Sequence, residues 1–213
     1  MRTRVKICGI THYEDALDAA NAGADAIGMV LYEKSPRFVS NSLAERISHH
    51  MPAFVSRVAL FKDADKQDIE SVLDVVDIDI IQFHGAEPVD FCEQFDKPYI
   101  KALGMKGAEH DIEYLISSAN KYQSAKALLL DGHAPGEAGG TGESFDWVAI
   151  TSAMAAIENP VILAGGLTVE NVKQAIETVH PFAVDVSSGV ESSPGIKDKE
   201  KITAFIRQVD QTG

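Results

Sequence analysis

The sequence predicts an α/β fold in which eight parallel strands close into one (β/α)8 barrel. Short apolar runs alternate with amphipathic stretches throughout the 213 residues, and we count eight such strand–helix units. Alternation of this kind requires parallel strands joined by right-handed crossovers. No linker or low-complexity segment interrupts the pattern, so we expect residues 1–213 to form a single domain.

A doubly wound open sheet would also satisfy the alternation. Eight similar units in a chain of this length fit a compact closed barrel better, because closure removes both edges of the sheet. The first strand runs into "ICGITHYED", which lacks the GxGxxG pattern of dinucleotide-binding sheets. Both features favour the barrel.

The expected elements follow from periodicity and from stop signals. A strand over 4–8 precedes a helix over 11–23 that has an apolar stripe and ends at Gly23. The run 25–32 does not alternate, as expected for a parallel strand covered on both faces. Further strands are predicted at 54–61, 79–85, 99–104, 125–132, 160–166 and 182–189. Further helices are predicted at 41–51, 64–76, 87–95, 109–122, 144–156, 168–179 and 197–209.

Composition and charge exclude several classes of protein. The formal net charge of −13 gives no electrostatic support to a nucleic-acid or anionic-membrane surface. The two cysteines, Cys8 and Cys92, are far apart and form no CxxC pair, which argues against a disulfide framework and fits a reducing compartment. The N-terminal segment lacks a signal-peptide core, and no stretch approaches the ~20 apolar residues of a membrane span. We therefore expect a cytoplasmic protein.

Residues that can carry chemistry stand where the predicted strands end. In a (β/α)8 barrel these ends meet at one mouth, where functional groups gather. We expect the following residues to converge there: Cys8, Arg37, His84, Asp131, Gly165, Gly166, Asp185, Ser187, Ser188 and Gly189.

The last two units predict a phosphate site. "LAGGL" contains Gly165 and Gly166, which allow close backbone approach, and the N–H groups of Ser187, Ser188 and Gly189 can form a nest for an anion. Such glycines also make ordinary tight turns. Their positions after strands seven and eight, where barrels often bind phosphate, favour the binding site.

Asp131 and Cys8 are candidates for proton transfer. Asp131 ends the apolar run "AKALLLDG" on the same face as Ala127 and Leu129, where a partly desolvated carboxyl can act as a proton donor. The dipeptide "DG" is also a turn signal, so a structural role stays open. Cys8 ends the first strand with the parity of Lys6, and its thiolate could act as a base. Cys92, on an expected helix, is interpreted as packing.

Two further side chains are candidates for substrate contacts. Arg37 in "SPRFV" can hold a carboxylate through two parallel hydrogen bonds, although most loop arginines are solvated. His84 in "QFHG" can bind substrate or simply cap a strand. No second ligand at suitable spacing indicates a metal site. The glycine-rich segment after Asp131, "HAPGEAGGTGESFDW", is consistent with a mobile lid or with a plain surface loop.

Seven short motifs, taken in order from near Arg4 to near Arg207, resemble those of the phosphoribosylanthranilate isomerase family. They are "KICGIT", "SPRFV", "QFHG", "DG…PG…GGTG…FDW", "LAGGL", "DVSSGVE" and "PGIKD". Each motif is weak alone, but the ordered set is specific. The sequence departs from the family pattern at Phe83, where Leu is common, and in the longer "PGEAGG" loop.

The resemblance implies a catalytic barrel of tryptophan biosynthesis that needs no metal or organic cofactor. Its reaction is the Amadori rearrangement of N-(5-phosphoribosyl)anthranilate, a small phosphosugar, to 1-(2-carboxyphenylamino)-1-deoxyribulose 5-phosphate. By matching positions, Asp131 is implied as the general acid on the ribose ring oxygen and Cys8 as the base at C2. Arg37 is implied to face the anthranilate carboxylate, and His84 and Asp185 to line the pocket. The glycine and serine segments match the family's phosphate loops. Members differ in oligomeric state, so a monomer or a homodimer is expected.

Two other functions remain as alternatives. One is another phosphosugar enzyme on the same barrel, such as a Schiff-base lyase that uses Lys101 or Lys6, although we favour a structural ion-pair role for a strand lysine. The other is a barrel that binds phosphate ligands without catalysis. Such a binder requires neither Cys8 nor Asp131.

Overall fold

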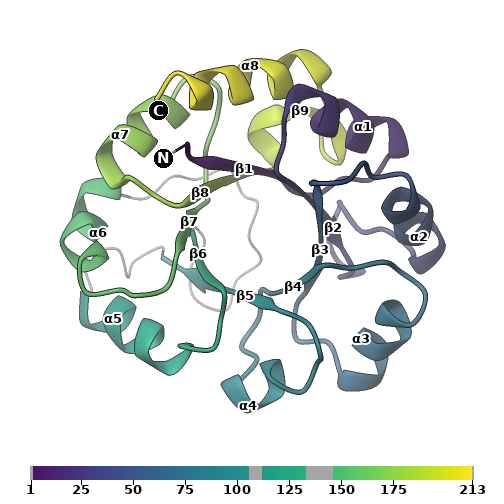
Figure 1. Ribbon diagram of the computed structural model, residues 1–213, viewed down its shortest axis with the longest axis horizontal. Coiled ribbons are helices and arrows are strands. Elements are labelled where there is room, and N and C mark those ends of the chain that lie inside the picture. The colour runs from purple at the N-terminus through teal and green to yellow at the C-terminus, as the bar shows by residue number, and fades with distance from the viewer. Residues whose placement is uncertain (1, 106–111, 133–145, 213) are drawn as a thin grey trace.

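A computed structural model of the chain describes residues 2–105, 112–132 and 146–212. Eight parallel strands close into a barrel in sequence order, with β1 (Arg4–Ile7) paired to β8 (Ala183–Val186). The other barrel strands are β2 (Ala26–Val30), β3 (Ser56–Phe61), β4 (Ile80–Phe83), β5 (Tyr99–Gly104), β6 (Ala127–Asp131) and β7 (Val161–Leu163). The predicted closed barrel is confirmed, and Figure 1 views it down its axis.

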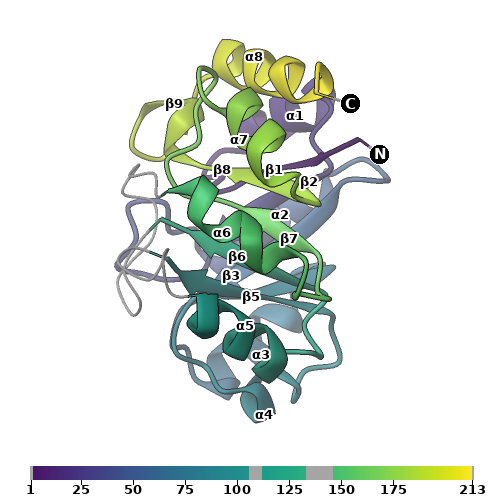
Figure 2. The same cartoon turned by 90° about the vertical axis from the view of Figure 1, so that its left-hand side faces the viewer.

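Helices form a ring outside the strands, as Figures 1 and 2 show from two directions. They are α1 (Tyr13–Ala22), α2 (Asn41–His49), α3 (Lys66–Leu73), α4 (Val89–Cys92), α5 (Ile112–Lys121), α6 (Trp147–Met154), α7 (Val172–Val179) and α8 (Lys199–Asp210). Gly23 ends α1 in the left-handed conformation, with φ of 104°, as its position after the apolar stripe predicted. In the described part of the chain, no helix has the length and apolarity to cross a membrane.

Two apolar layers hold the barrel together. The larger one lies between strands and helices and includes Ile27, Phe61 and Leu128, all fully buried or nearly so. The smaller one includes Leu129 and Ala127, whose side chains alternate with Leu128 along β6. Because both faces of each strand are buried, the strand sequences show no clean alternation of polar and apolar residues.

The helix expected over 87–95 is shorter than predicted, because α4 spans only Val89–Cys92. Glu87 stays outside it, since its carboxylate accepts hydrogen bonds from the backbone N–H groups of Gly85 and Asp63 and pairs with Lys101 at 2.7 Å. These contacts hold Glu87 outside the helix, so α4 begins later than predicted.

A small antiparallel hairpin follows the barrel strands and was not predicted. A 3₁₀ turn, η1 (Ser188–Val190), leads into β9 (Glu191–Ser193), which pairs with β10 (Ile196–Lys197). Gly195 makes the turn with φ of +82°. In Figure 2 the hairpin lies at the opposite end of the barrel from the N-terminus.

Residues 106–111 and 133–145 lie outside the described residues. They include the start of the helix predicted at 109–122, the first residues of the helix predicted at 144–156, and most of the glycine-rich segment that we interpreted as a lid or a surface loop.

Candidate active site

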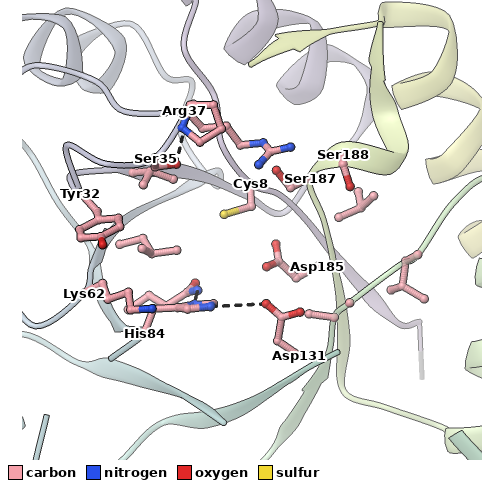
Figure 3. Close-up of a pocket in the computed structure, with 18 of the residues that line it drawn as sticks. Cys8, Tyr32, Ser35, Arg37, Lys62, His84, Asp131, Asp185, Ser187 and Ser188 are labelled. Atoms are coloured by element: carbon pink, nitrogen blue, oxygen red, sulfur yellow. Dashed lines mark hydrogen bonds and ion pairs between the residues drawn. The ribbon is translucent and has the colours of Figure 1, made fainter. Parts of the chain in front are cut away.

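A pocket opens at the carboxyl ends of the strands, and the predicted site residues gather around it. Its wall contains all of them except Gly189. Figure 3 shows Cys8 and Arg37 on one side, His84 and Asp131 on the other, and Asp185 between them. The barrel therefore brings together residues that are far apart in the sequence.

Cys8 lies one residue beyond β1, where its backbone N–H donates to the Val186 carbonyl of β8 at 2.8 Å. Its side chain is almost completely buried at the pocket wall. Gly28 of β2 leaves room for it, because a Cβ at that position would stand 2.8 Å from the Cys8 Sγ. Burial raises the pKa of Cys8 above the usual cysteine value, and the charge of Lys6 partly opposes this effect. The resting group at neutral pH is therefore a thiol.

Lys6 and Asp185 form a buried ion pair next to this thiol. Lys6 Nζ donates to Asp185 Oδ1 at 2.9 Å, and both side chains are at least nine-tenths buried. Burial alone lowers the pKa of Lys6, but the carboxylate of Asp185 and the neighbouring Cys8 raise it above the ordinary lysine value. Lys6 is therefore an ammonium ion. Sequence analysis placed Asp185 in the site but missed its partner, although Lys6 shares the strand parity of Cys8.

Asp131 ends β6 and faces His84. His84 Nε2 lies 3.4 Å from Asp131 Oδ2, and both side chains are about nine-tenths buried. On the other side of the imidazole, His84 Nδ1 shares a hydrogen bond of 3.1 Å with Gln82 Nε2. The amide of Gln82 thus fixes the ring plane, and the ring in turn orients the carboxyl of Asp131 toward the pocket.

Gly165 and Gly166 form a corner of the pocket after β7. Both have positive φ, +79° and +64°, which side chains rarely adopt. Asn171 braces this turn, because its Nδ2 donates to the Gly166 carbonyl at 2.9 Å and its Oδ1 accepts from the Thr168 N–H at 2.8 Å. Both glycines line the pocket.

Ser187 and Ser188 complete this corner after β8, whereas Gly189 stands behind it. A Cβ on Gly189 would overlap the carbonyl oxygen of Leu167, which follows the Gly165–Gly166 turn. Gly189 therefore serves the site by letting the two loops approach each other, which differs from the expected direct contact.

Replacing Gly189 by Ala is expected to weaken the binding of inorganic phosphate about tenfold, which corresponds to roughly 1.4 kcal/mol. The added methyl group collides with the Leu167 backbone and separates the two loops of the corner. Calorimetric titration with phosphate measures the effect. Ser193→Ala, an exposed change on the hairpin that follows Gly189, is the control. Unchanged phosphate affinity in Gly189→Ala would contradict this role.

Arg37 already holds a carboxylate through two parallel hydrogen bonds, and that carboxylate is Glu191 of β9. Its Nε donates to Oε1 at 2.7 Å and its Nη2 to Oε2 at 2.8 Å. Lys197 of β10 also donates to Glu191 Oε1, at 2.8 Å. Burial alone raises the pKa of Glu191, but Arg37 and Lys197 outweigh it and lower the pKa below its usual value. The hairpin thus holds the Nε–Nη2 edge of the guanidinium, and Arg37 also lines the pocket wall.

Several residues of the pocket wall were not predicted from the sequence. Tyr32 and Lys34 follow β2, Lys62 follows β3, and Gln82 lies on β4 two residues before His84. Their positions just after or near strand ends were the available signal, because that is where barrels carry their functional groups. Within residues 2–105, 112–132 and 146–212, no group of three or more His, Cys, Asp or Glu side chains is placed to hold a metal ion.

Fold and site together define a class: a (β/α)8-barrel enzyme with its reactive groups at the carboxyl ends of the strands and a glycine-rich corner after the last two. The family described as N-(5'phosphoribosyl)anthranilate (PRA) isomerase matches residues 5–208. The chain therefore belongs to the N-(5'-phosphoribosyl)anthranilate isomerase family, as the motif resemblance implied.

Individual relatives agree with this assignment. The N-(5'-phosphoribosyl)anthranilate isomerase of Pseudomonas savastanoi pv. phaseolicola is 51% identical over 209 residues, which cover 98% of each chain. The crystal structure of phosphoribosyl anthranilate isomerase from Thermotoga maritima superposes with a TM-score of 0.87 at 41% identity, over 98% of this chain and 99% of that one. A phosphoribosyl anthranilate isomerase in complex with reduced 1-(O-carboxyphenylamino)-1-deoxyribulose 5-phosphate gives a TM-score of 0.84 at 39% identity, over 98% and 99%.

Proposed function

We propose that the chain isomerises N-(5-phosphoribosyl)anthranilate to 1-(2-carboxyphenylamino)-1-deoxyribulose 5-phosphate in tryptophan biosynthesis. The observation that carries the proposal is a buried thiol and a buried carboxyl on opposite sides of one pocket, beside a glycine-rich corner. The family match and a relative solved with a reduced form of this product support the substrate.

The first step is ring opening, with Asp131 as the general acid. The carboxyl of Asp131 gives its proton to the ribose ring oxygen while the bond between that oxygen and C1 breaks. The nitrogen lone pair then forms a double bond to C1, which yields an iminium ion. His84, 3.4 Å from Asp131, supports the carboxyl and lines the pocket near the sugar.

The second step is proton removal from C2, with Cys8 as the general base. The Cys8 thiol first gives its proton to water, and the resulting thiolate takes the proton from C2. The C2–H electron pair forms a C1–C2 double bond that neutralises the iminium. The resulting enolamine tautomerises to the ketone, with proton loss at the C2 oxygen and proton gain at C1. Cys8 is then again a thiol, and Asp131 recovers its proton from water. The positive iminium favours the thiolate at the moment it is needed.

The substrate's two anionic groups set its direction in the pocket. The phosphate fits the corner of Gly165, Gly166, Ser187 and Ser188, where oriented N–H groups compensate for a negatively charged protein. The anthranilate carboxylate fits the guanidinium of Arg37, and Asp185 lies between the reactive groups, where ribose hydroxyls are expected.

Replacing Glu191 by Gln is expected to raise KM about tenfold, roughly 1.4 kcal/mol, and to change kcat little. The neutral amide cannot accept both hydrogen bonds from Arg37, so the guanidinium loses the orientation in which it binds the substrate. Steady-state kinetics measures the change, with Glu200→Gln, an exposed change on α8, as the control. A large fall in kcat at unchanged KM would contradict a positioning role in binding.

Neither lysine of the lyase alternative is placed to form a Schiff base. Lys101 is absent from the pocket wall formed by described residues and donates to Glu87 at 2.7 Å and to the Gly85 carbonyl at 2.6 Å. Lys6 is an ammonium ion paired with Asp185. A Schiff base requires a neutral amine, so these contacts support the structural ion-pair role that we favour for Lys101.

The direct test is turnover of freshly made phosphoribosylanthranilate, followed by the loss of anthranilate fluorescence. We expect saturable turnover without added metal or cofactor. Binding without turnover would support the non-catalytic alternative. A lysine adduct trapped by borohydride would support the lyase.

We further propose that the protein works in the cytoplasm, as a single catalytic domain over residues 1–213. Both cysteines are free, which suits a reducing compartment and the use of Cys8 as a base. A family match over residues 5–208 supports the single domain. For the assembly we propose a monomer or a homodimer, and one structural relative is described as generated monomers of a dimeric phosphoribosylanthranilate isomerase from Thermotoga maritima. Light scattering in solution distinguishes the two states.

A further inference from the structure

We infer that Lys6 is a positioning residue for the reaction, and that its ammonium group, anchored by Asp185, sets how readily the Cys8 thiol loses its proton. The inference rests on the proposed function only in the use it assigns to the thiolate. The geometry that supports it concerns the protein alone.

The ammonium and the thiol are neighbours in space. A Cβ on Gly28 would stand 2.8 Å from Cys8 Sγ and 3.1 Å from Lys6 Nζ, so both atoms surround the same point against β2. Lys6 lies on β1 and Cys8 follows its last residue, two positions later, so the alternation of the strand continued by one residue puts both side chains on one face. The absence of a side chain at Gly28 allows this approach.

Burial makes the interaction strong. Side-chain exposure is 5% for Lys6 and 9% for Asp185, so little water screens the charge of the ammonium from the thiol. Asp185 offsets part of that charge but also fixes the position of Nζ, at 2.9 Å. The ammonium thus stays charged in a site where an isolated one would be costly.

Other charged groups also lie near Cys8 and contribute to the pKa of its thiol. Lys197 of β10 and Arg37 of the loop after β2 are cationic and interact with the thiol over longer range, and Asp185 of β8 opposes them. Lys6 is the cation with the largest effect on Cys8, and it lowers a pKa that burial has raised. The other buried side chains in the hydrophobic cluster of Cys8 are Val30 and Leu60, which are apolar.

Lys101 provides a matched comparison. It is also a buried strand lysine, with 3% side-chain exposure and a carboxylate partner, Glu87, at 2.7 Å. It lies on β5, away from the pocket wall that contains Cys8. A purely structural role for a buried lysine pair can therefore be measured separately.

The experiment is a titration of the Cys8 thiolate by ultraviolet absorbance without substrate, with Cys8→Ser in each background subtracted to remove other signals. Lys6→Met is expected to move the titration to higher pH by about one unit, and Asp185→Asn to move it lower. Lys6→Met combined with Asp185→Asn should lie between Lys6→Met and the wild type. Lys101→Met combined with Glu87→Gln should leave the titration where it is, whatever it does to stability.

The pH dependence of kcat/KM should change in the same direction as the thiol titration. The raised pKa means that thiolate, and with it kcat/KM, increases as pH rises. In Lys6→Met the rise of kcat/KM with pH should occur at higher pH. At pH values below that rise, kcat/KM should be about tenfold lower than in the wild type.

Unshifted titrations in both Lys6→Met and Asp185→Asn would overturn the inference, as would a Lys6→Met shift to lower pH. If Lys6→Met does not fold, Lys6→Gln, which removes the charge but keeps a side chain that can donate to Asp185, decides: a shift to higher pH supports the inference, and no shift or a shift to lower pH overturns it. A wild-type protein that shows the expected thiol shifts but no turnover of phosphoribosylanthranilate would refute the proposed function and leave this inference standing.

Discussion

Asp131→Asn is expected to lower kcat by roughly 10²- to 10⁴-fold, the usual contribution of a general acid. The amide keeps the shape of the side chain but cannot deliver a proton to the ring oxygen. The 3.4 Å approach of His84 to Asp131 and the burial of both groups leave little room for water to replace the acid. Because the fold and the phosphate corner are untouched, affinity for the product should change little.

Steady-state turnover and product inhibition, measured on the same preparation, test this expectation. Asp65→Asn is a suitable control, because Asp65 caps α3 through its side chain and asparagine caps equally well. Turnover of Asp131→Asn within a few fold of the wild type would remove Asp131 from the role of acid.

Cys8→Ser is expected to produce a loss of similar size, roughly 10²- to 10⁴-fold in kcat. The hydroxyl fits the space beside Gly28, but an alcohol ionises far less readily than a thiol and so makes a much weaker base. Proton removal from C2 then becomes the slowest step. A substrate carrying deuterium at C2 should therefore show a larger isotope effect with Cys8→Ser than with the wild type, whereas Asp131→Asn should show none of this increase.

Cys92→Ser is the matched control, since Cys92 is the other buried cysteine but lies in α4, outside the pocket wall. Burial raises the pKa of Cys92 to about 11, so this thiol takes no part in titrations near neutrality. Turnover should persist in Cys92→Ser even if the protein is less stable. An unaltered isotope effect in Cys8→Ser would argue that another group removes the proton.

Local patterns in the sequence were sufficient to predict the barrel and several of the residues at its mouth. Strand parity put Asp131 on the same face as Leu129, and Leu129 does lie in the smaller apolar layer of the barrel. The same reasoning predicted that Cys8 reaches the pocket. The helix predicted at 87–95 begins later than expected, at Val89, because Glu87 is engaged by Lys101. Helical periodicity contains no information on this contact between different strand–helix units.

The sequence by itself therefore determined the eight units, the closed sheet and the strand ends at which a thiol, a carboxyl and two glycine-rich loops stand. Only the tertiary structure decided which groups these side chains touch. Lys6 meets Asp185 across 179 residues, and Arg37 meets Glu191 across 154. The physical reason is closure: pairing β1 with β8 brings the first and last strand–helix units side by side, and no local pattern specifies which charges then become neighbours.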